Sequence, residues 1–143
     1  VDRLPDGMRT TVLLRVYEGL SFEAIGGILE RNEVAVRKRY SRALDLLVAF
    51  ARRQVATVRA VLPEVIVLAE VQVLKGRRFG NLVVAASSAP LPVEWLPRLM
   101  AAGPHPAKVA QGAEIDEFIR DARPATDADA TPSPKPSASI FDR

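Results

Sequence analysis

The sequence predicts an α+β protein in which a head of three helices, arranged as a helix-turn-helix, is joined by a long helix to a small α/β body. Three observations support this fold class. Apolar residues recur at helical spacing as far as residue 62, positions 65–87 are rich in β-branched residues, and proline and small polar residues fill the end of the chain. We expect a helical head over residues 1–50, an α/β segment with a β-hairpin over 51–123, and a flexible, disordered tail over 124–143.

Composition sets limits on this arrangement. A chain of 143 residues with 48% hydrophobic content can hold one ordinary domain or two small ones. The absence of cysteine excludes disulfides, thiolate catalysis and zinc sites that need thiolates. Since no apolar run approaches the roughly 20 residues that span a bilayer, and no signal peptide opens the chain, we expect a cytoplasmic protein without a membrane partner. The chain begins with Val1 rather than methionine, which we interpret as the sign of a fragment or a trimmed product.

The first two helices have recognisable starts and ends. Pro5 and Asp6 stand where the first helix should begin, a position at which proline costs least, and Gly19 ends its apolar run. Ser21 is suited to cap the second helix, which should extend to Leu29. The apolar positions expected to face the core are Val12, Leu13, Val16 and Tyr17 in the first helix, and Ile25, Ile28 and Leu29 in the second.

The third helix is the longest predicted element. Asn32 should cap its start, and helical periodicity continues until Pro63 ends it after Leu62. An unbroken helix of this length measures roughly 45 Å, and the alternative is a kink near Phe50. The predicted buried stripe comprises Val36, Tyr40, Ala43, Leu44 and Leu47.

The opposite face of this helix is basic. Five basic residues and one acidic residue lie between Arg31 and Arg42. The stripe behind them directs Glu33, Val34, Arg37, Lys38 and Ser41 outward, with Arg42 at the edge of the exposed face. A short helix, a turn and a second helix with a cationic face indicate a protein that reads the major groove of duplex DNA.

Each of these residues has a predicted role. Glu33 and Val34 should lie nearest the base edges, and Arg37 and Lys38 can reach guanine or phosphate. Arg39 and Arg42 should hold phosphates. The residues alone also allow a plainer interpretation, in which the basic face only keeps a small helical bundle in solution.

Residues 4–47 resemble region 4 of bacterial sigma factors, especially the extracytoplasmic-function group. The residues that carry the resemblance are Leu4-Pro5, Arg9, Leu14-Arg15, Glu18 to Ser21, Glu23, Ile25, Leu29, Glu33, Val36-Arg37, Arg39 and Ser41 to Ala43. The resemblance implies a helix-turn-helix that binds the −35 promoter element and touches the β-flap of RNA polymerase. It makes double-stranded DNA and the RNA polymerase core the expected partners, with a DNA-binding set of Asn32, Glu33, Val34, Arg37, Lys38, Arg39, Ser41 and Arg42.

Two positions depart from the family pattern. Glu30 occupies a turn position that is usually glycine, and the second helix contains the pair Gly26-Gly27. A non-glycine residue at positive φ is strained, and glycine inside a helix costs about 1 kcal/mol relative to alanine. We therefore expect a head that is less stable than usual, with its DNA-binding face intact.

The α/β segment is expected to contain three strands, a further short strand and two helices. Its β-branched residues predict strands at 65–69, 71–75 and 81–87, with the last two paired as a hairpin around residues 75–80. Further predicted elements are a helix over 91–102 that contains Trp95, a short strand at Val109-Ala110, and a helix over 113–120 that buries Ile115, Phe118 and Ile119.

Residues 52–130 resemble the C-terminal end of spermidine-synthase-like proteins, most closely over 59–63, 76–82 and 87–92. That family's glycine-rich turn, ribose-binding acid and catalytic aspartate lie upstream of the matching part, so the resemblance implies a catalytically incomplete polyamine aminopropyltransferase fragment. Exposed strand edges in this segment favour self-association. A third alternative is a join of two unrelated pieces.

No catalytic, cofactor-binding or metal-binding residue is expected. The single histidine, His105, has no spaced partner, and Ser87-Ser88 lacks the Gly-x-Ser-x-Gly turn of a nucleophile. Glu114, Asp116 and Glu117 lie at the start of a helix, where carboxylates favour the macrodipole. Asp127 and Asp129 fall in the predicted tail. The sequence therefore predicts DNA binding in transcription initiation rather than enzyme activity.

Overall fold

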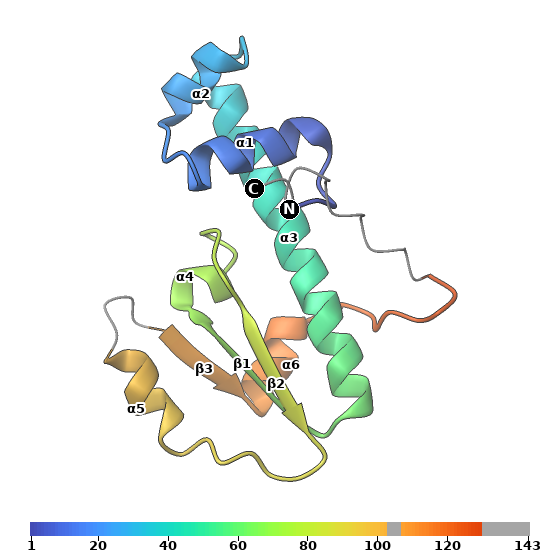
Figure 1. The fold of residues 1–143 in the computed structure, drawn as a ribbon. Helices are drawn as coiled ribbons and strands as arrows, with labels where there is room; N and C mark the ends of the chain where they lie inside the picture. Colours follow the sequence, from blue (N-terminus) through green and yellow to red (C-terminus); the bar gives the residue numbers. More distant parts are fainter. Residues whose placement is uncertain (103–106, 130–143) are drawn as a thin grey trace, which may run out of the picture.

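The computed structural model describes residues 1–102 and 107–129 (Figure 1). The loop predicted around His105 and the part of the predicted tail from residue 130 onward lie outside the described residues. The elements in chain order are α1 (Asp6–Val16), α2 (Phe22–Ile28), α3 (Glu33–Val61), β1 (Glu64–Glu70), α4 (Val71–Leu74), β2 (Val83–Ser87), α5 (Leu96–Ala101), β3 (Ala107–Gln111) and α6 (Ala113–Ile119). The predicted α+β class is confirmed.

The head consists of α1 and α2 packed on the first half of α3 (Figure 1). Its core is small: Leu4, Val12 and Ala43 are buried together, and partly buried side chains pack around them. Phe79 is among these surrounding side chains, although it belongs to the body. The head is therefore completed by a residue from outside the three helices.

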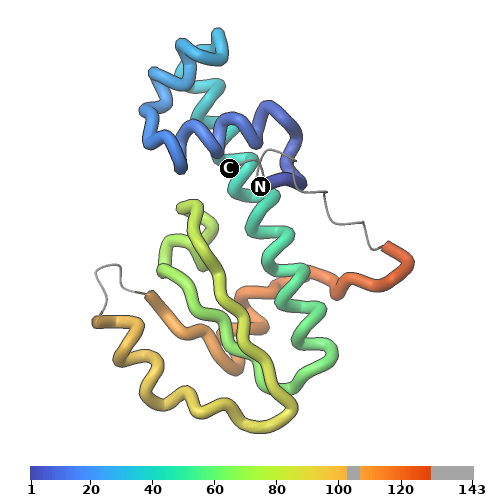
Figure 2. The backbone as a smooth tube through the Cα atoms, in the orientation of Figure 1, coloured from blue at the N-terminus to red at the C-terminus, as the bar shows by residue number. Residues whose placement is uncertain are grey.

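Helix α3 runs without a break through both halves of the molecule (Figure 2). Its 29 residues correspond to about 44 Å at the usual helical rise, so the unbroken alternative is confirmed and the kink near Phe50 is absent. Val36, Ala43 and Leu44 are buried within the head, as predicted. Val55 and Ala56 are buried in the second half, where the helix packs on the body.

The body is built on a three-stranded antiparallel sheet with the order β2-β1-β3. Val67 of β1 lies opposite Val84 of β2 and Ala110 of β3, which fixes the register of both pairs. Helices α3 and α6 cover one face of this sheet (Figure 1). The core between them contains Val55, Val65, Val67, Ala110, Ile115 and Phe118.

The connection between β1 and β2 differs from the prediction. Residues 71–74 form the short helix α4 rather than a strand, so the antiparallel hairpin joins β1 to β2 instead of 71–75 to 81–87. Gly76, at φ 68°, ends this helical turn, and a Cβ on Gly80 would come within 2.5 Å of the Val73 side chain. β-branched residues favour strands, but here the close packing of Val73 on Gly80 holds a tight turn.

The later elements follow the prediction more closely. The strand at Val109-Ala110 is confirmed as the centre of β3, and the helix expected over 113–120 is confirmed as α6, with Ile115 and Phe118 buried. The helix expected over 91–102 is shorter, because α5 begins only at Leu96. Pro90 and Pro92 precede it, and proline restricts the residue before it to extended backbone.

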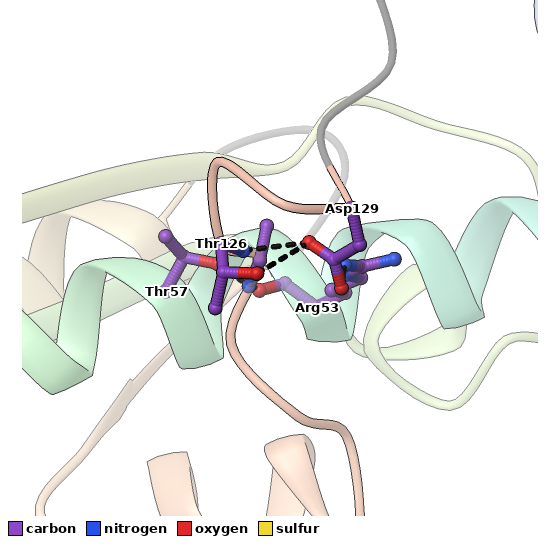
Figure 3. A network of polar contacts seen from close by, with 5 residues as sticks. Arg53, Thr57, Thr126 and Asp129 are labelled. Atoms are coloured by element: carbon purple, nitrogen blue, oxygen red, sulfur yellow. Dashed lines mark hydrogen bonds and ion pairs between the residues drawn. The ribbon is translucent and has the colours of Figure 1, made fainter.

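Residues 124–129 lie along α3, although the sequence placed them in a flexible tail (Figure 3). The backbone N–H of Ala125 donates to Oγ1 of Thr57 at 2.8 Å. Asp129 accepts hydrogen bonds from the N–H and hydroxyl of Thr126 and forms an ion pair with Arg53. The sequence pattern missed this segment because its polar residues are satisfied by α3 rather than by a core.

Within the part of the chain that is described, no helix is long and apolar enough to cross a membrane.

Candidate nucleic-acid interface

The turn between α2 and α3 is held by a close backbone approach. The N–H of Arg31 donates to the carbonyl oxygen of Gly26 at 2.9 Å, and a Cβ on Gly26 would lie only 2.6 Å from the carbonyl oxygen of Arg31. Glycine is therefore required at this position. It lowers the stability of α2, but only a residue without a side chain allows the turn to pass this close to the helix. Glu30 has a φ of 51°, as its place in the turn predicted.

Both helices of the pair begin at the predicted caps. Ser21 Oγ accepts a hydrogen bond from the N–H of Ala24 at 3.1 Å, and Asn32 Oδ1 accepts one from the N–H of Ala35 at 2.8 Å. Such caps satisfy backbone donors that a helix leaves free at its start. Because the Asn32 oxygen is used in this way, its amide nitrogen is the group left to approach a ligand.

The outward face of α3 consists of a few strongly exposed side chains. Val34 is 73% exposed, and Lys38, Ser41 and Arg42 are exposed one and two turns further along. Val36 and Ala43 are buried on the opposite side. This part of the predicted DNA-binding surface is therefore available to a partner, and its backbone is fixed by the core behind it.

Arg37 lies at the flank of this face and makes two contacts. Its Nε donates to Oε1 of Glu33 at 2.8 Å, and its guanidinium lies 4.8 Å from the ring centre of Phe22. The side chain remains 60% exposed. These contacts orient the guanidinium at the junction of α2 and α3, so that less side-chain entropy is lost when it binds a base or phosphate. Glu33, which is half-buried, competes for the same guanidinium.

Phe22 extends this arrangement to α1. The guanidinium of Arg15 lies 4.7 Å from the ring centre of Phe22, while Nη1 of Arg15 donates to the carbonyl oxygen of Leu20 at 2.7 Å. Two arginines therefore contact one aromatic ring, from α1 and from α3. Helical periodicity did not single out Phe22 or Arg15, and the pairing of one aromatic with two cations was visible only in three dimensions.

Arg39 lies at the opposite flank. It is half-buried, and its Nη1 lies 3.3 Å from the position that a Cβ on Gly7 would take. The guanidinium thus lies along the first turn of α1. The basic residues predicted from the sequence therefore divide into an exposed centre, Lys38 and Arg42, and two flanking residues that contact neighbouring helices.

The body reaches the head through the turn that follows α4. The rings of Phe79 and Tyr17 meet edge to face, with their centres 6.5 Å apart. A groove of about 570 Å³ lies beside this contact, and Arg15, Phe22, Arg77 and Phe79 are among its lining residues. The head and body are thus in direct contact in addition to sharing α3.

Comparison with known proteins addresses the head alone. Residues 1–47 match the family model for sigma-70, region 4. The match covers the three helices of the head and the exposed face of α3, and it supports DNA binding in transcription initiation. The description of the matched family is that of a transcription-factor domain. No curated protein and no solved structure matches the chain, and the resemblance of residues 52–130 to spermidine-synthase-like proteins receives no support from these comparisons.

Side chains that could suggest catalysis have other roles in the structure. Oγ of Ser87 accepts a hydrogen bond from the N–H of Ala89 at 3.0 Å, in the turn after β2. Glu114 forms an ion pair with Lys108, and the hydrogen bond from Lys108 is the main reason that the pKa of Glu114 is lowered. In residues 1–102 and 107–129, no group of three histidine or acidic side chains could hold a metal ion.

Proposed function

We propose that the chain binds duplex DNA sequence-specifically during transcription initiation, with the start of α3 in the major groove of a −35 promoter element and with RNA polymerase as its partner. The observation that carries this proposal is the exposed face of α3 within the segment that matches sigma-70 region 4. A cytoplasmic location is part of the proposal, because promoter DNA and polymerase are found there.

The geometry suggests that residues along α3 have different roles in binding DNA. Asn32 and Glu33 lie at the helix start, and Val34, which is 73% exposed, offers an apolar surface to a thymine methyl group. Lys38 and Arg42 project from the exposed centre toward the phosphates or guanine, with Ser41 between them as a hydrogen-bond donor. Arg37 can release Glu33 and donate its hydrogen bonds to a base edge instead. Arg39, at the flank of the exposed face, binds a phosphate.

The test is a titration of a fluorescently labelled duplex with the full chain. Binding is measured by fluorescence anisotropy and is repeated at a series of salt concentrations. Each phosphate contact contributes about 0.9 to the slope of log affinity against log salt. The double variant K38A/R42A should therefore lower this slope by roughly 1 to 2 units. The matched control is R98A, which removes an exposed arginine from α5, on the body. An equal response of K38A/R42A and R98A, or binding that does not depend on salt, would refute the proposal.

Base-specific reading requires a second comparison. The variants V34A and R37A should each reduce the preference for one duplex over a panel of single base-pair substitutions, and a good base contact contributes about 1–3 kcal/mol of discrimination. Non-specific affinity should change little for V34A, because it removes no charge. If both variants keep the wild-type ranking of the panel, α3 does not read sequence through these residues.

The polymerase part of the proposal is tested separately. The full chain, immobilised through an added tag, should retain purified bacterial RNA polymerase core, and K38A/R42A should retain it equally well because these residues face DNA. No retention of the core by either protein would contradict polymerase as a partner, and DNA binding would remain to be judged from the titrations.

A further inference from the structure

A second cluster of cations lies in the body, far along α3 from the proposed DNA-binding face. It surrounds a cavity of about 280 Å³ between the second half of α3, α4, β3 and α6. The charged residues in its lining are Arg52, Lys75, Lys108, Arg120, Glu114 and Glu117, and the remaining wall is largely apolar. Since Lys108 is paired with Glu114, the cations that remain are Arg52, Lys75 and Arg120, with Glu117 as the remaining acid.

Arg52 is held in this wall at an energetic disadvantage. Its Nε is buried and has no hydrogen-bond partner among the described residues, while its guanidinium lies over the ring of Phe118, at 5.9 Å from the ring centre. Burial and then the positive charge of Arg120 lower the pKa of Arg52, and Asp121 partly offsets them. A buried donor without an acceptor destabilises the folded state.

Arg120 is strained at its backbone. It ends α6 with φ 56° and ψ −121°, a conformation that residues with a side chain rarely adopt. Arg120 and Arg52 line the same cavity, and the positive charge of Arg120 contributes to the lowered pKa of Arg52. Two like charges, one of them on a residue with a strained backbone, therefore line one cavity, and strain of this kind tends to gather at binding sites.

We propose that this cavity binds a small oxyanion, a phosphate or carboxylate group on a compact molecule with an apolar part, held between Arg52 and Arg120. An oxyanion in the cavity accepts charge-assisted hydrogen bonds from the terminal nitrogens of both guanidiniums and removes the repulsion between the two cations. Its apolar part fits against Val71, Leu74 and Ala110 in the same lining. The volume is at or just below the lower end of ordinary ligand pockets, which begin at about 300 Å³, so the ligand is a small one.

The first experiment titrates phenyl phosphate, benzoate and inorganic phosphate into the full chain without DNA. Binding is followed by isothermal titration calorimetry and by the NMR resonances of the arginine Nε–H groups. We expect saturable binding of phenyl phosphate, with a dissociation constant of about 1 mM or lower for a molecule of this size, and a shift of the Arg52 resonance. The ranking of the three probes distinguishes a phosphate site from a carboxylate site and measures the contribution of the apolar part.

The decisive variant is R120G. Glycine adopts positive φ without strain, so R120G should melt at a higher temperature than the wild type while binding phenyl phosphate roughly tenfold more weakly, since it loses a charged hydrogen bond. A residue with a merely structural role cannot give this opposite pair of effects. R52K keeps the positive charge but loses the bidentate hydrogen bonding of the guanidinium, and it should therefore also weaken the binding of phenyl phosphate.

The control is R98A, whose guanidinium lies outside the lining of the cavity and whose loss should leave affinity unchanged. The proposal is overturned if none of the three probes binds saturably at up to about 10 mM, a concentration that reveals even weak sites. It is also overturned if R120G and R52K both bind phenyl phosphate as tightly as the wild type. These outcomes do not depend on DNA binding by the head.

Discussion

The two halves of α3 place their cations in opposite environments. In the head, one stripe of the helix is buried, and Lys38 and Arg42 project into solvent. In the body, α3 is contacted by β1, β2 and α6 and by the segment 124–129, and Arg52 is half-buried. A solvent-facing cation suits a large polyanion such as DNA, whereas an enclosed cation suits a small anion that can enter a cavity. The environment of each side chain, more than its residue type, separates the two proposals.

The largest expected effects come from truncating one fully buried isoleucine in each half of the molecule. Ile25 in the head is fully buried, and Ile115 in the body is 1% exposed. I25A and I115A should each lower the free energy of unfolding by about 2–5 kcal/mol, the range for such truncations in a packed core. The measurement is chemical denaturation followed by circular dichroism.

The same two variants separate the functions of the two halves. At a temperature where both remain folded, I25A should weaken DNA binding more than I115A, and I115A should weaken phenyl phosphate binding more than I25A. Equal losses of both activities in both variants would show that the head and body unfold and act as one unit.

Phe79 contacts the head from the body, outside α3. F79A should lower the free energy of unfolding by about 1–3 kcal/mol, less than the 3–5 kcal/mol of a fully buried phenylalanine, because the ring is only partly buried. F79A should also accelerate hydrogen exchange, relative to the wild type, more in α1 than in the sheet. V83A, at a position that is 58% exposed on β2, is the control and should leave exchange in α1 unchanged. Uniform acceleration across the chain would argue against a local brace.

The adjacent glycines of α2 provide a matched test of the turn. A Cβ on Gly26 meets the carbonyl oxygen of Arg31 at 2.6 Å, whereas a Cβ on Gly27 meets nothing within 4 Å. G26A should therefore destabilise the head by about 1–3 kcal/mol through overpacking, and G27A should stabilise it by about 0.5–1 kcal/mol through its better helix propensity. Thermal unfolding of the two variants should show shifts of opposite sign. A stabilising G26A would show that the turn can relax around the added methyl group.

These glycines also show how far the sequence predicts the head. The caps at Ser21 and Asn32 follow from capping chemistry and are confirmed. Of the stripe predicted from helical periodicity, Val36, Ala43 and Leu44 are buried, whereas Tyr40 and Leu47 are half-buried. Periodicity was wrong for Leu13, Tyr17 and Ile28, which were expected to face the core and are exposed. The need for Gly26 could not be predicted in this way, because it depends on a carbonyl oxygen across the turn. The contacts of Arg37 and Arg15 with Phe22 were missed for the same reason.

The body was less predictable because its contacts join distant parts of the chain. β-branched residues in 71–75 indicated a strand, but packing of Val73 on Gly80 favours a helical turn. The cavity around Arg52 combines four elements, and its most informative residue, Arg120, has an unusual backbone that no sequence pattern marks. The segment 124–129 is polar enough to be predicted as flexible, yet it lies on α3 through Thr57 and Arg53.

The smallest expected effect concerns this segment and pH. The pKa of Asp129 is lowered, chiefly by the hydrogen bond from the backbone N–H of Thr126; desolvation opposes this effect, and the Thr126 hydroxyl and Arg53 lower the pKa further. A carboxyl group whose pKa is lower in the folded state stabilises that state above its unfolded pKa, and this stabilisation is lost as pH falls through the folded value. Residues 124–129 should therefore detach from α3 below about pH 4, before the cores unfold.

The amide resonances of Ala125 and Thr126, followed by NMR as the pH is lowered, report this detachment. In D129N the same resonances should already be shifted at neutral pH and should lack the acidic transition. D127N is the control, because Asp127 makes no hydrogen bond in the Thr126–Asp129 network drawn in Figure 3. If D127N rather than D129N removes the transition, then Asp129 does not anchor the segment. Residues 124–129 would then be held on α3 by the hydrogen bond from the N–H of Ala125 to Thr57.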